Sequence, residues 1–114
     1  MGPGRTKRRV SVTIRKFVSD AAQARRYFIS GMVQGVGYRF FAQHAAEKLQ
    51  VCGFVRNLRD GRVEVYAIGA SDHLAELRSA LERGPRFSSV TQVREETAQV
   101  DSRFANDFII SYDD

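Results

Sequence analysis

Between Arg26 and Tyr112 the spacing of the apolar residues changes in a regular order, and this order admits few folds. Apolar and polar residues alternate, as they do in strands, at 26–30, 52–58, 62–68, 90–97 and 108–112. Two stretches have helical spacing instead, one over residues 38–49 and one over residues 74–81. The element order is therefore β-α-β-β-α-β with an additional short C-terminal strand. It predicts an α+β, ferredoxin-like sandwich, in which two helices cover one face of a mainly antiparallel sheet.

Each expected helix has one apolar stripe. In the first helix the stripe consists of Tyr38, Phe41, Ala42, Ala45 and Leu49. In the second helix it consists of Leu74, Leu77 and Leu81. Only Arg78 interrupts the second stripe, and its stem can pack against the core while its charged head reaches water. Ser71 or Asp72 is the expected N-cap of this helix, and Gly84-Pro85 is expected to end it.

The net charge of +5 is concentrated near the N-terminus. Residues 1–25 contain seven Lys or Arg and one acid, whereas the rest of the chain contains eleven Lys or Arg and twelve Asp or Glu. We therefore expect residues 1–24 to form a basic, disordered leader and residues 25–114 to form one folded domain. Four interpretations of the leader stay open: a dispensable arm, an extra edge strand at 10–14, a nucleic-acid tail and a transit peptide.

The composition argues against several classes of protein. Cys52 is the only cysteine, so an intrachain disulfide is impossible, and we interpret it as a small buried side chain. One cysteine with His44 and His73 makes no structural zinc cluster. No apolar run approaches the roughly 18 residues of a membrane span, and the leader lacks the apolar centre of a secretory signal. We expect a cytoplasmic monomer with no cofactor, no metal and no membrane partner.

The segment from Gly31 to Arg39 joins the first strand to the first helix and contains three glycines, one arginine and no acid. Glycines let the backbone approach a ligand, and amides at a helix N-terminus are unpaired and carry the positive end of the helix dipole. Arg39 adds a planar fork of donors that matches two phosphate oxygens. The spacing fits neither the dinucleotide fingerprint nor the P-loop. The segment is therefore either an anion-binding loop or an ordinary β–α turn with a solvated arginine.

Asn57 is the second candidate for a functional residue. By the period of two it shares a face with Val55, near the end of the strand that follows the first helix. Its amide can hold a water molecule beside a phosphoryl or acyl group, provided that the fold brings it to the segment from Gly31 to Arg39, which we call the glycine loop. The alternative is that Asn57 only opens the turn at Asp60-Gly61, which is a hairpin signal. No Ser, Cys or Lys nucleophile with an activating base is evident.

Two linked blocks of sequence resemble the acylphosphatase family, from about residue 26 to residue 112. The residues that carry the resemblance are Gly31-x-Val33-Gln34-Gly35-Val36-Gly37-Tyr38-Arg39-Phe40, Ala46, Gly53-Phe54-Val55-Arg56-Asn57-Leu58, Asp60-Gly61-x-Val63-Glu64-Val65 and Gly84-Pro85. The resemblance implies a small α/β sandwich that hydrolyses acyl phosphates to carboxylate and orthophosphate, without a metal ion or a phosphoenzyme. It also implies that Asn57 positions the attacking water and that Arg39 binds the phosphate. The backbone amides that would assist Arg39 are those of Gln34, Gly35, Val36, Gly37 and Tyr38.

The sequence departs from the family pattern at two positions. Met32 stands where an arginine or another polar residue is usual, and Gln50 stands where a glycine usually ends the first helix. Gln50 needs a left-handed or otherwise adjusted backbone, which costs about 1 kcal/mol relative to glycine.

A second function stays open, namely a non-catalytic module of the same fold that binds phosphate-containing ligands or RNA. The near-neutral body of the chain and the lack of an RNP1-like run argue against it. We therefore expect a small-molecule acyl phosphate, and no specific nucleic acid, as the partner.

Overall fold

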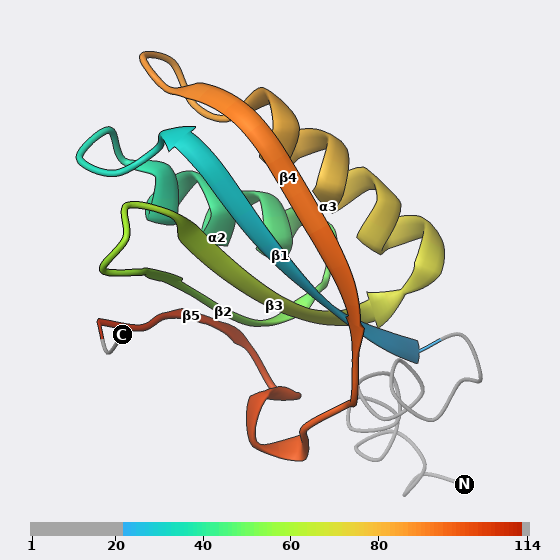
Figure 1. The fold of residues 1–114 in the computed structure, drawn as a ribbon. Helices are drawn as coiled ribbons and strands as arrows, with labels where there is room; N and C mark the ends of the chain where they lie inside the picture. Colours follow the sequence, from blue (N-terminus) through green and yellow to red (C-terminus); the bar gives the residue numbers. More distant parts are fainter. Residues whose placement is uncertain (1–21, 113–114) are drawn as a thin grey trace, which may run out of the picture.

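The computed structural model describes residues 22–112 of the chain. Its elements are β1 (Ala22–Met32), α2 (Tyr38–Lys48), β2 (Cys52–Asn57), β3 (Val63–Ala70), α3 (Ser71–Arg83), β4 (Ser89–Ala98), the 3-10 turn η1 (Ser102–Phe104) and β5 (Phe108–Ile110). The predicted βαββαβ order with an additional short strand is confirmed. Both helices lie on the same face of the sheet (Figure 1). The expected leader lies outside the described residues, except for residues 22–24, which belong to β1.

The five strands form one mixed sheet in the order β4-β1-β3-β2-β5. The pairs β4–β1, β1–β3 and β3–β2 are antiparallel, and only β2–β5 is parallel. The two strands of the candidate site, β1 and β2, are therefore parallel to each other, with β3 between them. Each strand lies 4.7–4.9 Å from the next in a typical sheet, which places β1 and β2 about 10 Å apart.

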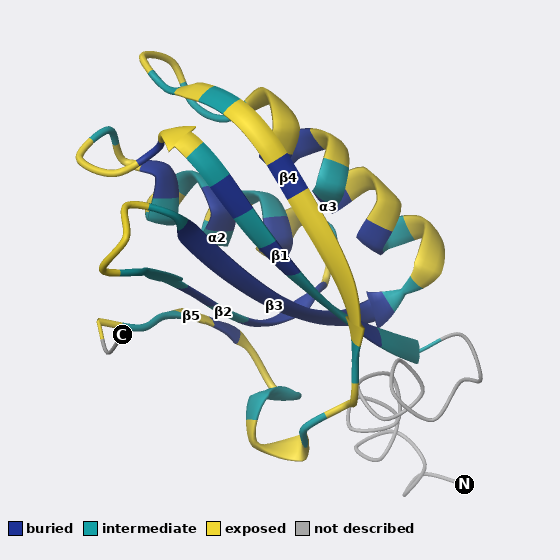
Figure 2. Ribbon diagram, viewed as in Figure 1, coloured by how far each residue is buried: buried dark blue, intermediate teal, exposed yellow. Residues whose placement is uncertain are grey.

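The core lies between the sheet and the two helices, and its buried residues are dark blue in Figure 2. Val63, Val65 and Ala67 of β3 belong to this core and share one face of the sheet by the period of two, and the residues between them are buried on the other face. The buried tyrosine hydroxyls are satisfied by carbonyls of α3, because Tyr38 donates to Leu81 O at 2.6 Å and Tyr27 to Leu74 O at 3.3 Å. From α2 the core takes Tyr38, Ala42 and Ala46, with Ala45 and Leu49 partly buried at its margin.

The prediction of the α3 N-cap was wrong. β3 runs directly into α3, so the cap position falls on Ala70, which keeps an extended backbone and has no capping side chain. Ser71 is already helical, and the Asp72 carboxylate accepts a hydrogen bond from His73 N. At the other end Gly84 follows the helix with φ 67°, as the glycine-proline stop predicts.

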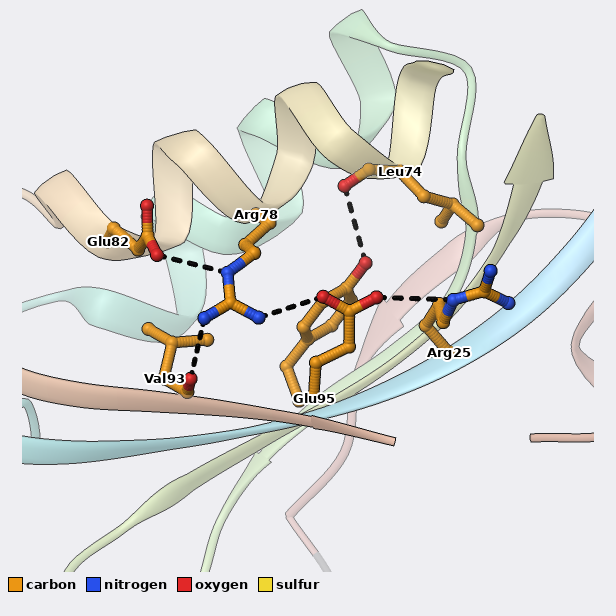
Figure 3. Close-up of polar contacts among 7 residues, drawn as sticks. Arg25, Leu74, Arg78, Glu82, Val93 and Glu95 are labelled. Carbon is orange, nitrogen blue, oxygen red and sulfur yellow. Dashed lines mark hydrogen bonds and ion pairs between the residues drawn. The ribbon is translucent and has the colours of Figure 1, made fainter. Parts of the chain in front are cut away.

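Arg78 joins α3 to the sheet from within the apolar stripe (Figure 3). Its guanidinium bonds to Glu82 at 3.0 Å, to Glu95 at 2.8 Å and to Val93 O at 2.8 Å. These hydrogen bonds to Glu95 and Glu82 raise the pKa of Arg78 above its ordinary value. Glu95 also accepts from Arg25 of β1 at 3.2 Å. The network therefore ties one helix to two adjacent strands.

The end of α2 confirms the expectation for Gln50. Its φ is 58°, in the left-handed region. Gln50 N donates to Glu47 O at 3.1 Å, and Val51 N donates to Ala46 O at 2.9 Å. This pair of bonds is the Schellman motif, in which glycine is the usual left-handed residue. Gln50 therefore adopts the left-handed conformation that was expected at this helix end.

Candidate active site

The carboxyl ends of three strands meet at one edge of the sheet, at the left of Figure 1. Ile29 of β1 and Asn57 of β2 pair with Val63 from its two sides, so β2 ends level with the start of β3, and β1 continues beyond that level to Met32. β5 runs parallel to β2 and ends at the same edge. The glycine loop after β1, the end of β2 and the end of β5 are thus gathered in one region.

The glycine loop delivers the chain to the start of α2 in a left-handed conformation. Gly35 has φ 78°, and Gly37, at the N-cap, has φ 78° and ψ 20°. Both lie in open space, so the backbone angle, and not crowding, is what favours glycine there. The N-terminus of α2 has no side-chain cap and no acid in its first turn. It therefore presents unpaired amides and the positive end of a helix dipole to an anion.

Gln34 fastens this loop to the β2–β3 hairpin, a contact that the sequence did not predict. Its side-chain Nε2 donates to Leu58 O at 2.8 Å and to Arg62 O at 2.9 Å. Leu58 N in turn donates to Arg62 O at 2.8 Å across the turn. The two hydrogen bonds from Gln34 are called the Gln34 clamp below. Because Leu58 follows Asn57 directly, this clamp holds the glycine loop against the strand end that carries Asn57.

Arg39 lies in the first turn of α2 and is partly buried. Its guanidinium carbon lies 4.9 Å from the centre of the Tyr112 ring, within the range of a cation–π contact. Ser111 N donates to Val55 O at 2.8 Å, which extends the parallel pairing of Val55 with Ile110. Continuing that register brings Tyr112 level with Asn57. Arg39 thus contacts the chain segment that neighbours Asn57.

Asn57 is the last residue of β2, and its side chain is on the same side of the sheet as the buried Val55. Within residues 22–112, its Oδ1 is the buried side-chain oxygen or nitrogen that has no hydrogen-bond partner in the protein. A buried acceptor without a partner costs about 1–3 kcal/mol. Such an atom beside the candidate anion-binding loop is suited to accept a hydrogen bond from a bound molecule.

The other polar candidates are not part of this arrangement. Cys52 is buried, as expected, and His44 is exposed on α2. In the described part of the chain no three His, Cys, Asp or Glu side chains are grouped as a metal site. No helix among the described residues is long and apolar enough to cross a membrane.

Comparison with known proteins agrees with this geometry. The family model described as acylphosphatase matches residues 25–110. The chain belongs to the acylphosphatase family. An acylphosphatase of Solibacter usitatus is 53% identical over 87 residues, which are 76% of this chain and 91% of that protein. An acylphosphatase of Pasteurella multocida is 44% identical over 88 residues, 77% of this chain and 97% of the relative.

Solved structures show the same relation. The crystal structure of acylphosphatase from Bacillus subtilis has a TM-score of 0.74 and 36% identity, and the match covers 78% of this chain and 98% of that one. An acylphosphatase from Coxiella burnetii has a TM-score of 0.75 and 34% identity, covering 80% of this chain and 94% of that one. The chain is therefore a hydrolase that acts on acyl phosphates, and its fold is the ferredoxin-like fold of that family.

Proposed function

We propose that this acylphosphatase binds the phosphoryl group of its substrate with Arg39 and the backbone amides of residues 34–38, and that Asn57 orients the attacking water. The observation that carries the proposal is Asn57 Oδ1, a buried acceptor without a protein donor. It lies at the end of β2, to which Gln34 fastens the glycine loop through Leu58 O. The catalytic roles of Arg39 and Asn57 follow from this juxtaposition and from the family resemblance.

Phosphate binding is an electrostatic task. The phosphoryl group of an acyl phosphate is a dianion, and it gains most from donors that are already oriented before it arrives. The first turn of α2 offers such amides, since the helix has no capping side chain and no first-turn acid. Arg39 adds a permanent charge in the same turn. Together they supply the positive potential, so the proposed mechanism uses no metal ion.

Water attack is a matter of orientation. One O–H group of the water donates a hydrogen bond to Asn57 Oδ1, which turns a lone pair of the water oxygen toward phosphorus. The bond to the acyl oxygen breaks as the water oxygen bonds to phosphorus, and the carboxylate leaves. A carboxylate is a good leaving group, so no general acid is needed. The proton of the attacking water passes to an oxygen of the substrate's own phosphoryl group.

Two single variants test the two roles separately by steady-state hydrolysis of benzoyl phosphate. Arg39→Ala is expected to lower kcat/KM by about 10³-fold or more and to abolish competitive inhibition by inorganic phosphate. Asn57→Ala is expected to lower kcat by about 10²–10³-fold while inhibition by phosphate is largely kept.

Matched controls come from exposed residues outside the site. Arg86→Ala and Asn106→Ala make the same chemical changes at exposed positions, and both are expected to keep the parental rate. The same assay with a chelator checks the metal-free mechanism, because the rate should not change. An undiminished rate in Arg39→Ala or Asn57→Ala would remove that residue from its role.

A further inference from the structure

The sheet face opposite the helices carries a second group of side chains, which we call the open face. Its aromatic members are Phe28, Phe54, Tyr66 and Phe104, and its arginines are Arg26, Arg56, Arg62, Arg94 and Arg103. Within residues 22–112 only η1 and its flanks cover part of this face, where Phe104 and Ala105 pack on Tyr66 and Ile68. In Figure 1 this face is turned toward the viewer, with α2 and α3 behind the sheet.

The strand registers set arginines beside aromatic rings across the sheet. Phe28 pairs with Arg94 of β4, and two guanidinium carbons lie over its ring, that of Arg94 at 4.8 Å and that of Arg62 at 4.9 Å from the ring centre. In the next row Arg26 pairs with Tyr66 and its guanidinium carbon lies 5.0 Å from the ring centre. The planar groups of the open face thus lie across the sheet in stacked pairs.

A buried carboxylate fixes two of these arginines. Glu64 is 3% exposed, and its two oxygens bind Arg26 and Arg56 from the neighbouring strands. Both arginine side chains remain about one-third exposed, at 33% and 31%. The triad keeps one net positive charge, and the two guanidinium groups are held in place before any ligand binds.

A hollow of about 630 Å³ lies beside this triad, between the sheet and the segment around η1. Ligand sites typically have volumes of 300–1,000 Å³, so a nucleotide fits within it. Phe54 and Phe104 line it with ring centres 5.0 Å apart, and Arg103 lines it from η1. The backbone of this segment is held to the sheet, because Tyr66 Oη donates to Gln99 O and accepts from Asp101 N.

The charge of the open face selects among possible occupants. Its five arginines face four carboxylates, namely Asp60, Glu64, Glu96 and Asp101. Residues 1–21 add six Lys or Arg and only Asp20, and they join the sheet at the start of β1. A leader or second copy of like charge is therefore disfavoured on this face. A polyanion is attracted by the charge of the open face and by the charge of residues 1–21.

We propose that the open face binds single-stranded nucleic acid without sequence preference, with one nucleotide in the hollow beside Glu64. Single strands are bound by positively charged surfaces on which the bases stack against aromatic rings and guanidinium planes. Arg94 and Arg103 are 55% and 78% exposed, and each is ion-paired with one carboxylate, that of Glu96 or Asp101. Their exposed guanidinium groups contact phosphates, and Phe104 stacks on a base. This face is opposite to the one that holds Asn57, so the binding is independent of the hydrolytic site.

The test measures binding of the full-length chain to fluorescein-labelled oligouridylate of about twelve nucleotides by fluorescence anisotropy. The double variant Arg94→Glu/Arg103→Glu is compared with Arg83→Glu/Arg86→Glu, which makes the same charge change at exposed positions on and after α3. The open-face variant should bind about 10-fold more weakly or worse, and the slope of log affinity against log salt should fall by about 1.4 for two lost phosphate contacts. The control should lose less than about 3-fold. Equal losses in the two variants would overturn the proposal.

A second variant and two other ligands test the stacking. Phe104→Ala leaves the charge unchanged and should weaken binding by about 5- to 100-fold, while circular dichroism and the benzoyl phosphate rate confirm that the chain is folded. A duplex of the same length should bind more weakly than the single strand. Vesicles that contain phosphatidylserine are the second of these ligands. The proposal fails if Phe104→Ala binds the oligonucleotide like the parent or if the duplex binds equally well. It also fails if the open-face variant loses binding to the vesicles but not to the oligonucleotide.

Discussion

Replacing Gln34 with methionine tests how the active site is assembled. Gln34→Met keeps the length of the side chain but removes the Nε2 donor, which lies 2.8 Å from Leu58 O and 2.9 Å from Arg62 O. A typical hydrogen bond contributes a net 0.5–1.5 kcal/mol, and both bonds are exposed, so we take the low end. The free energy of unfolding should then fall by about 1 kcal/mol, which lowers Tm by about 4–8 °C in a domain of this size.

The larger effect is expected on turnover. Without the clamp, the glycine loop is no longer fixed to the strand end that carries Asn57, and a displacement of about 1 Å between reacting groups costs about 100-fold in rate. We therefore expect kcat for benzoyl phosphate to fall by about 10- to 100-fold. Inhibition by inorganic phosphate should change less than kcat, because Arg39 and the Tyr38 amide stay in the first turn of α2 and only the amides of residues 34–37 move with the loop.

The assay combines steady-state kinetics with thermal unfolding of the same preparations. Gln92→Met makes the same chemical change at an exposed position of β4 and serves as the control. If Gln34→Met lowers Tm as expected while kcat stays within about two-fold of the parent, the clamp only stabilises the fold, and the reasoning that links it to catalysis is wrong.

Three further predictions concern stability. Gln50→Gly relieves a left-handed backbone and should raise the free energy of unfolding by about 1 kcal/mol, whereas Gln50→Ala should give no gain in the same urea titration. Burial raises the pKa of the Tyr38 phenol, so the unfolded chain ionises first above pH 10.0 and stability falls by about 1.4 kcal/mol per pH unit. Tyr38→Phe should reduce the slope by about that amount and leave the contribution of Tyr27, whose pKa is also raised chiefly by burial, and an unchanged slope would refute the assignment. Glu95→Gln weakens the bonds from Arg78 and Arg25 and should cost about 1 kcal/mol at low salt, with a smaller cost in concentrated NaCl if charge is the cause.

The sequence predicted the features that depend on local spacing. The order of strands and helices, the hairpin at Asp60-Gly61 and the left-handed Gln50 all follow from residues within a few positions of one another. The exception was the α3 cap, because nothing in the local sequence revealed that β3 continues without a loop into Ser71. Strand ends are set by pairing with distant strands, and Ala22 joins β1 because it pairs with Ala70.

The contacts that assemble the active site were beyond local reasoning. Gln34 binds carbonyls 24 and 28 positions further along the chain, and Arg39 meets Tyr112 only because β5 lies parallel to β2. The family pattern contains Gln34, but one sequence cannot show whether its side chain or its backbone matters. The available signal was a glutamine directly before Gly35 in a turn, since glutamine has no special preference for such a position.

The alternation of side chains along β2 explains how one thin sheet can serve two surfaces. Val55 and Asn57 face the helices and the proposed hydrolytic site, while Phe54 and Arg56 face the opposite side. A shift of the β2 register by one residue would exchange these two sets, so both surfaces depend on the same pairing. Gly53 helps to fix that pairing, because its φ is 138° and a Cβ there would lie 1.8 Å from Tyr66 O. Only glycine lets β2 approach β3 so closely at this point, and the close approach aligns every later residue of the strand. The pairing that buries Val55 thereby places Asn57 at the site edge and Arg56 against Glu64 on the other face.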